Sequence, residues 1–166
     1  MSDPKPIKRL AFVLNQTKSG ASELLDRLKE AALERGVEVR ETSEFPVPDG
    51  YLEGMDACCV IGGDGTFLSV AAESTRRQVP LIGVNRGTLG FLTTYTAEEI
   101  EEALPAVLDG AYKVRSRGLL ECRTHEDHMD LALNDVVIKA ASVSRIAHLN
   151  VFADDEFVTT YVCDGL

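Results

Sequence analysis

Short apolar runs and helical patterns alternate along the first 111 residues of this 166-residue chain, and this alternation constrains the fold more than any other feature. Residues 9–14, 57–61 and 80–84 are apolar runs of strand length, and charged residues alternate with Val37 and Val39 in a further strand. Helical patterns separate these strands and end near Gly36, Gln78 and Asp109, and Thr96 and Glu99 predict a capping box at the start of the last helix. Strands that alternate with helices are typical of an open parallel sheet, so an α/β fold is predicted here.

In such a sheet the ligand crevice lies beyond the carboxyl ends of the strands. Three polar loops follow the predicted strands at that edge: 15–20, 62–66 and 85–90. We therefore expect any ligand site in this part of the chain to be formed by these three loops.

The pattern changes after Ala111, where helical periodicity ends. Four further segments are typical of strands, namely 119–123, 131–138, 146–153 and 156–162, and Asp154-Asp155 predicts a tight hairpin turn. We therefore divide the chain into an α/β nucleotide-binding domain, residues 1–111, and an incomplete β-rich domain, residues 112–166. Because four strands form a thin sheet with one uncovered face, we expect the chain to be a fragment of a longer protein.

Charge and composition exclude several classes of function. The chain has 17 Lys and Arg against 27 Asp and Glu, and its net charge of −10 repels nucleic acids and anionic membranes. No apolar run approaches the ~20 residues that span a bilayer, and no apolar segment of a secretory signal follows Met1. We expect a cytoplasmic protein whose cysteines are reduced and buried, with the adjacent Cys58 and Cys59 on opposite faces of a strand: Cys58, Cys59, Cys122 and Cys163.

The segment 62–66, Gly-Gly-Asp-Gly-Thr, joins a predicted strand to a predicted helix. Its glycines favour positive φ and close approach of a ligand, and N–H groups at the helix start face a phosphate, so a phosphate loop is predicted from Gly62, Gly63, Gly65 and Thr66. Because Asp64 would repel a phosphate, it suits a general base for a hydroxyl or a ligand of Mg²⁺. The structural alternative is a tight turn with Asp64 as the N-cap.

Two other polar segments are candidate binding elements. Arg86, in the third loop, is expected either to face a phosphate or to lie on the surface. Asn134 and Asp135 lie within the apolar run 131–138, where an amide and a carboxylate require partners. A pair of sugar hydroxyls would supply them, and a β-bulge or strand end is the alternative.

A cluster of histidine and acidic residues resembles a metal site in composition. It comprises His125, Glu126, Asp127 and His128, with Asp130 close by. Since it lies between two predicted strands, we interpret it as a polar hairpin loop and predict no metal site there.

Four segments together resemble the motifs of NAD kinases: 60–68 (VIGGDGTFL), 83–92 (GVNRGTLGFL), 133–137 (LNDVV) and 164–166 (DGL). Diacylglycerol and sphingosine kinases share the glycine motif, and phosphofructokinases do so more loosely, whereas the set of four is specific to NAD kinases. The resemblance covers nearly the whole chain from Lys8 onwards. It implies a nucleotide domain followed by a β-rich domain, and transfer of the γ-phosphoryl group of ATP to the 2′-hydroxyl of the adenosine ribose of NAD.

The resemblance also implies roles for individual residues. Asp64 corresponds to the base that takes the 2′-hydroxyl proton, and Gly65 lies beside it on NAD. The other NAD-binding positions fall on Asn134, Asp135, Arg145 and Asp164, and the ATP phosphates on Gly62, Gly63, Gly65 and Thr66. ATP and NAD are then the substrates, a divalent metal such as Mg²⁺ accompanies them, and we expect a homo-oligomer.

Some residues depart from the family pattern. Val162 stands where many members have Arg, which removes one charge contact to the dinucleotide, and Asp135 stands where many relatives have Glu. The family continues after Asp-Gly-Leu into a Thr-Pro-Thr-Gly-Ser-Thr-Ala-Tyr type of segment that this sequence does not contain, so we expect the 166-residue chain to be inactive alone. One alternative is a lipid kinase with the same glycine loop, which is disfavoured by Asn134 and Asp135 in a predicted strand and by the absence of a membrane-facing basic or amphipathic segment. The other is a non-catalytic nucleotide-binding fragment.

Overall fold

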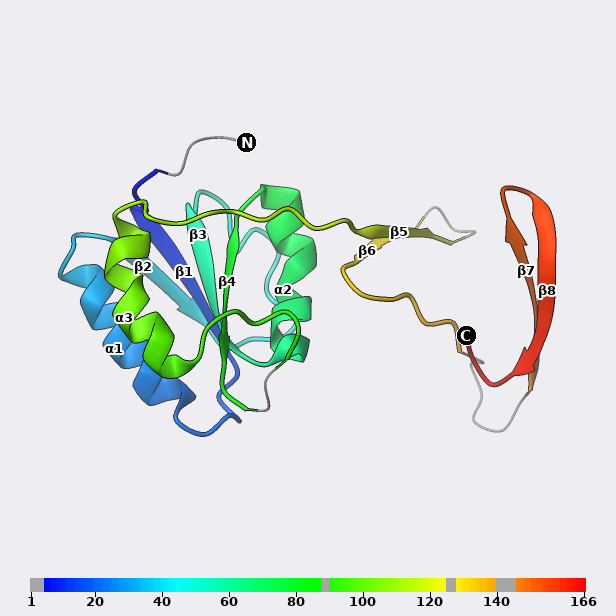
Figure 1. The fold of residues 1–166 in the computed structure, drawn as a ribbon, viewed down its shortest axis with the longest axis horizontal. Coiled ribbons are helices and arrows are strands. Elements are labelled where there is room, and N and C mark those ends of the chain that lie inside the picture. Colours follow the sequence, from blue (N-terminus) through cyan, green and yellow to red (C-terminus); the bar gives the residue numbers. More distant parts are fainter. Residues whose placement is uncertain (1–4, 88–89, 125–127, 140–145) are drawn as a thin grey trace. The chain divides into compact units, whose positions relative to one another are not determined.

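The structure is a computed structural model that describes residues 5–87, 90–124, 128–139 and 146–166. It divides into two compact units, Met1–Gly118 and Leu119–Leu166. The first unit is built on a four-stranded parallel sheet with the strand order β2-β1-β3-β4 (Figure 1). Its strands are β1 (Arg9–Leu14), β2 (Glu38–Thr42), β3 (Ala57–Gly62) and β4 (Leu81–Asn85). The predicted α/β fold with a parallel sheet is therefore confirmed.

Three helices cover the two faces of this sheet. They are α1 (Ala21–Leu33), α2 (Asp64–Arg77) and α3 (Ala97–Leu108), with α1 and α3 on one face and α2 on the other (Figure 1). Each face has its own apolar cluster, because successive side chains of a strand point to opposite sides. Cys59 belongs to the cluster beneath α1 and α3, and Cys58 to the one beneath α2, as the sequence predicts.

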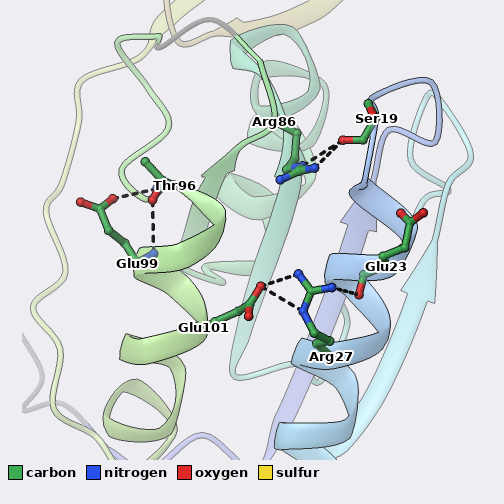
Figure 2. A network of polar contacts seen from close by, with 7 residues as sticks. All are labelled: Ser19, Glu23, Arg27, Arg86, Thr96, Glu99 and Glu101. Carbon is green, nitrogen blue, oxygen red and sulfur yellow. Dashed lines mark hydrogen bonds and ion pairs between the residues drawn. The ribbon is translucent and has the colours of Figure 1, made fainter.

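Helices α1 and α3 pack side by side and are joined at their surfaces by an ion pair. The guanidinium group of Arg27 donates to Oε1 of Glu101, with an Nε–Oε1 distance of 3.1 Å (Figure 2). The predicted capping box of α3 is present, since Thr96 Oγ1 accepts the Glu99 N–H at 3.2 Å and Glu99 Oε2 accepts the Thr96 N–H at 2.8 Å. This box fixes the point at which the chain leaves the loop after β4 and enters α3.

The strand register brings the three predicted loops to one edge of the sheet. Leu14 lies opposite Ile61, and Gly62 lies opposite Asn85, so β1, β3 and β4 end at the same level. Two backbone hydrogen bonds continue the pairing beyond the strands, from Asn15 N–H to the Ile61 carbonyl at 2.9 Å and from Arg86 N–H to the Gly62 carbonyl at 2.7 Å. The glycine loop after β3 therefore lies between the loops that follow β1 and β4.

The second unit contains two antiparallel hairpins. One pairs β5 (Leu120–Arg123) with β6 (Met129–Ala132), and the other pairs β7 (Ala147–Ala153) with β8 (Glu156–Cys163). The predicted turn at Asp154-Asp155 is confirmed, and both residues have positive φ, 50° and 67°, as a two-residue hairpin turn requires. The hairpins form two separate two-stranded sheets in place of the expected single four-stranded sheet.

The predicted strand 131–138 is wrong for most of its length. Strand β6 ends at Ala132, and residues 133–138 form an irregular segment. Val137 and Ile138 are more than half exposed, 57% and 55%, so the apolar run does not mark a buried strand. Cys122 and Cys163 are likewise partly exposed, which contradicts the expectation that all four cysteines are buried.

Candidate functional site

The carboxylate of Asp64 is held by three consecutive backbone amides of the loop after β4. The Phe91 N–H donates to Asp64 Oδ2 at 2.8 Å, and the amides of Leu92 and Thr93 donate to Oδ1 at 3.1 and 3.4 Å. Asp64 is the first residue of α2 and Gly63 is its N-cap, so the alternative in which Asp64 caps the helix is wrong. The side chain instead joins the start of α2 to the loop that follows the neighbouring strand.

These amides keep the carboxylate ionised. The hydrogen bond from Phe91 is the main reason why the pKa of the Asp64 carboxyl lies below its ordinary value. Partial desolvation acts in the opposite direction, and the amides of Leu92 and Thr93 add to the lowering of this pKa. The start of α2 also favours a negative charge at this position. At neutral pH the site therefore presents a charged carboxylate.

Gly90 makes the contact between this loop and Asp64 possible. A Cβ atom at position 90 would collide with all three outer atoms of the Asp64 carboxyl group. Only glycine therefore lets the backbone come close enough for the following amides to reach the carboxylate.

The glycines of the loop 62–66 fall into two kinds. A Cβ atom on Gly62 would collide with the side chain of Thr66, which is buried at 6% exposure, whereas a Cβ atom on Gly63 or Gly65 would meet no atom within 4 Å. None of the three has positive φ, so that part of the prediction is wrong. Gly62 is explained by packing within the chain, while Gly63 and Gly65 leave open space beside Asp64.

Two basic residues lie at the same edge of the sheet. The Arg86 guanidinium crosses to the loop after β1, where Nε donates to the Ser19 carbonyl at 3.1 Å and Nη2 at 2.6 Å (Figure 2). It packs over Gly20, whose φ of 68° places it in the left-handed region. A Cβ atom on Gly87 would lie 3.8 Å from Lys18 Nζ, so a second cation lies beside the loop after β4. Arg86 therefore neither stands free on the surface nor points away from the site, but holds two loops together.

A groove of about 390 Å³ opens beside Arg86. It lies between the loops after β1 and β4 and the start of α3, and is lined by Ser19, Asn85, Arg86, Gly87, Thr96, Ala97 and Glu98. The pKa of the Glu98 carboxyl is lowered, chiefly by its own backbone N–H, then by the Thr96 hydroxyl and more weakly by Arg86. This groove thus holds one cationic and one anionic side chain.

The second unit contains the other predicted NAD-binding residues that the structure describes. Asn134 and Asp135 are exposed in the irregular segment after β6, so the prediction that they are buried within a strand is wrong. The segment pairs through Lys139 with Gly165, next to Asp164, which is also exposed. Two of the four motifs, LNDVV and DGL, are thereby brought close together.

Gly165 is required at this pairing by sterics. A Cβ atom there would lie only 2.8 Å from the Ile138 carbonyl oxygen, and two backbone hydrogen bonds of 2.7 and 2.8 Å join Ile138 to Leu166. The DGL motif is therefore fixed to the chain that follows Asn134 and Asp135.

Some predicted residues lie outside the described part of the chain. Arg145 is one of them, as are residues 125–127 of the histidine cluster and residues 88–89 of the loop after β4. His128 and Asp130 are described, and their side chains approach to 3.9 Å on the exposed surface. The described residues contain no group of three or more His, Cys, Asp or Glu side chains placed to hold a metal ion. None of the described helices is both long and apolar enough to cross a membrane.

Sequence reasoning did not identify the amides of residues 91–93 or Lys18 as parts of the site. Because nearly every residue has a backbone amide, a sequence does not show which amides bind a side chain. Gly90 was the one residue of this segment that could have indicated a close approach of the backbone to the site. A glycine in the loop after a strand that neighbours β3 is expected to lie near the glycine loop, because adjacent parallel strands end at the same edge. Lys18 lies in the first of the three predicted loops.

Known proteins match the chain over both units. The family described as the ATP-NAD kinase N-terminal domain matches residues 51–112, a range that includes the glycine loop and residues 90–93. An NAD kinase of Pseudomonas putida (strain W619) is 37% identical over an alignment 165 residues long that covers 89% of this chain and 56% of that relative. NAD kinases of Solibacter usitatus and Methanothermobacter thermautotrophicus are 34% and 35% identical, over 97% and 95% of this chain and 61% and 59% of their own lengths.

The chain thus spans somewhat less than two thirds of the length of the curated relatives that it matches. Asp64 and the open glycines lie inside the range that the family match covers. Over the part of its relatives that it spans, this chain is similar to NAD kinases.

Proposed function

We propose that the protein that carries this sequence is an NAD kinase, which transfers the γ-phosphoryl group of ATP to the 2′-hydroxyl of the adenosine ribose of NAD and forms NADP. One observation supports this most strongly: an ionised carboxylate, Asp64, stands beside two glycines that face open space, in a chain similar to NAD kinases. The relatives are named NAD kinases in both bacteria and an archaeon.

In the proposed reaction Asp64 is the general base. The ribose oxygen forms a bond to the γ-phosphorus, while the bond between that phosphorus and the β–γ bridging oxygen breaks and ADP leaves with its electron pair. The hydroxyl proton passes to the Asp64 carboxylate. Phosphoryl transfer depends mostly on positioning and charge stabilisation, so a carboxylate of low pKa suffices when it is already ionised and correctly placed.

The open glycines are the proposed contact surface for the donor phosphates. Gly63 and Gly65 leave space at the start of α2, where N–H groups lack helical partners and favour an anion. Lys18 and Arg86 add positive charge at this edge. The donor arrives as MgATP, since Mg²⁺ is bound largely by substrate phosphates and water and needs no cage of protein ligands.

The proposed NAD contacts follow from the family motifs. Asn134, Asp135, Arg145 and Asp164 are the candidates, and Gly65 lies beside the base. The exposure of Asn134, Asp135 and Asp164 supports this proposal, because exposed side chains are free to bind ribose hydroxyls and need no buried partners. A homo-oligomeric state and a cytoplasmic location stay predictions.

A phosphoryl-transfer assay tests the proposal directly. The protein that carries this sequence is purified at its full length and incubated with MgATP and NAD, and NADP is measured by a dehydrogenase that accepts only NADP. Parallel reactions replace NAD by diacylglycerol or sphingosine. We expect NADP to form and neither lipid to be phosphorylated, whereas phosphorylation of a lipid in preference to NAD would establish the lipid kinase alternative. Binding of ATP without transfer to any acceptor would establish a nucleotide-binding module.

A further inference from the structure

The segment Gly90–Thr93 makes a contact that the proposed reaction does not by itself require. Its three amides converge on the single carboxylate of Asp64, and its glycine is the only residue type that fits against that carboxylate. A base that merely has to be charged does not need three donors from another loop. The arrangement calls for a geometric explanation.

The explanation lies in the number of acceptor positions on the carboxylate. Each oxygen of an ionised carboxylate accepts about two hydrogen bonds. Oδ1 accepts the amides of Leu92 and Thr93, whereas Oδ2 accepts only the amide of Phe91 among the described residues. As far as the described residues are concerned, one acceptor position therefore stays open, and it belongs to Oδ2.

We infer that the segment Gly90–Thr93 is a positioning element for the proposed base, which locks the Asp64 carboxylate so that Oδ2 is the atom that receives the substrate proton. This inference rests on the proposed function. Gly90 is accordingly a positioning residue that touches neither substrate. Its role is to let the backbone approach, so that Asp64 cannot rotate away from the open space beside Gly63 and Gly65.

The position of the segment in the fold explains how it holds Asp64. The Thr94 and Tyr95 amides donate to the Gly83 carbonyl at 2.9 and 3.0 Å, and Asn85 N–H donates to the Tyr95 carbonyl at 2.8 Å. The chain that follows the three amides is thus fixed to β4. The Thr93 side chain is buried, with 7% of the residue exposed, and this burial holds the Thr93 amide in place. Asp64 is therefore bound to a rigid part of the sheet edge.

A first experiment examines the contact without using activity. Amide chemical shifts of residues 91–93 are followed by NMR as the pH is lowered from 7. We expect all three amides to follow one transition whose midpoint lies below about 3.9, the ordinary pKa of Asp, and we expect Asp64→Asn to abolish it. At pH 7, Asp64→Asn should change the amide chemical shift of Phe91 more than those of Leu92 and Thr93. The inference would be overturned if the amide chemical shifts of residues 91–93 changed neither with pH nor in Asp64→Asn.

A second experiment measures the consequence for catalysis. Gly90→Ala must push the loop and the carboxylate apart, and a misplacement of about 1 Å can cost about 10²-fold in rate. We expect kcat to fall by about this factor with little change in either KM, and the acid limb of the kcat profile to move to higher pH because the amides no longer hold the charge. Gly118→Ala is the matched control, since a Cβ atom there meets nothing within 4 Å.

The outcomes separate the inference from the proposed function. If the wild-type protein at its full length forms no NADP, the proposed function fails, and the NMR titration alone decides whether the segment holds Asp64. If the wild type forms NADP and folded Gly90→Ala retains more than half of its kcat, the positioning role fails while the function stands. Circular dichroism of each variant shows that it is folded. An unfolded Gly90→Ala variant leaves the decision to the amide shifts of Asp64→Asn.

Discussion

The α/β unit and the β unit differ in how fully they bury their apolar side chains. Every buried hydrophobic residue of the described chain lies between Ile7 and Leu108, whereas the large apolar side chains of the hairpins are partly or largely exposed, with Phe152 at 58% and Phe157 at 60%. The position of Asp64 therefore depends on a core contained in its own unit. The hairpins are held by strand pairing, and a two-stranded hairpin alone is at best marginally stable.

This difference suggests a division of labour between the units. The proposed chemistry, with Asp64 and the open glycines, belongs to the unit that has a core, because a base must be held rigidly. The proposed NAD contacts belong to the unit with exposed segments, where side chains remain available to a ligand. The following predictions test this division.

The largest expected effect is that of Asp64→Asn on kcat. The amide keeps the shape of the side chain but does not accept the proton, and general base catalysis contributes about 10²–10⁴-fold. We expect kcat to fall by this factor, with a much smaller change in the binding of NAD. Asp26→Asn, an exposed carboxylate of α1, serves as the control. A variant that keeps more than half of the activity would show that Asp64 is not the base.

The next largest effect is a difference in stability between phenylalanine-to-alanine substitutions in the two units. Phe12 is fully buried in β1, and Phe12→Ala should lower the free energy of unfolding of the α/β unit by about 3–5 kcal/mol. Phe152 packs edge-to-face on Phe157, with ring centroids 5.6 Å apart, but both rings are exposed, so Phe152→Ala should cost less than about 1.5 kcal/mol. Urea unfolding monitored by amide signals of each unit measures both values. Equal losses would contradict the difference in burial.

The same difference explains how far the sequence predicted the structure. In the α/β unit the apolar residues of the pattern are buried, so the strands and the opposite faces of Cys58 and Cys59 were predictable. The capping box at Thr96 was predictable from its local sequence. In the β unit the apolar run 131–138 is not buried, and its pattern predicted a strand that is absent beyond Ala132. Turns depend on local chemistry, and Asp154-Asp155 was therefore predictable in either setting.

The site was predictable only where side chains carry the chemistry. Asp64 and the three loops could be placed from the spacing of strands and glycines. The amides of residues 91–93 could not, because backbone donors are the same in every residue type and their position depends on how the loop folds over α2. The sequence likewise does not show that Gly62 is packed against Thr66 while Gly63 faces open space, because this depends on the three-dimensional structure of the loop.

A smaller effect is expected from Asp135→Ala. Losing hydrogen bonds from ribose hydroxyls to a charged group costs roughly 1.5–3 kcal/mol, which raises the KM for NAD about 10- to 150-fold and leaves that for ATP nearly unchanged. Steady-state kinetics with each substrate varied in turn measure the two constants. Asp130→Ala is the control, because Asp130 is an exposed carboxylate of the same unit. Equal changes in both KM values would contradict a division in which the β unit binds NAD.

The smallest effect tests whether the α/β unit responds as one cooperative body. Thr96→Ala removes the acceptor of the Glu99 N–H at the start of α3, and losing such a cap costs about 1 kcal/mol. Because α3 packs into the same core as α1, this loss should appear at the slowest-exchanging amides of β1 and β3, while exchange in the β7–β8 hairpin stays unchanged. Thr96→Ser keeps an acceptor oxygen and should retain most of the stability. If Thr96→Ala instead speeds exchange in the hairpin by the same factor, the two units unfold together and the comparison between them does not hold.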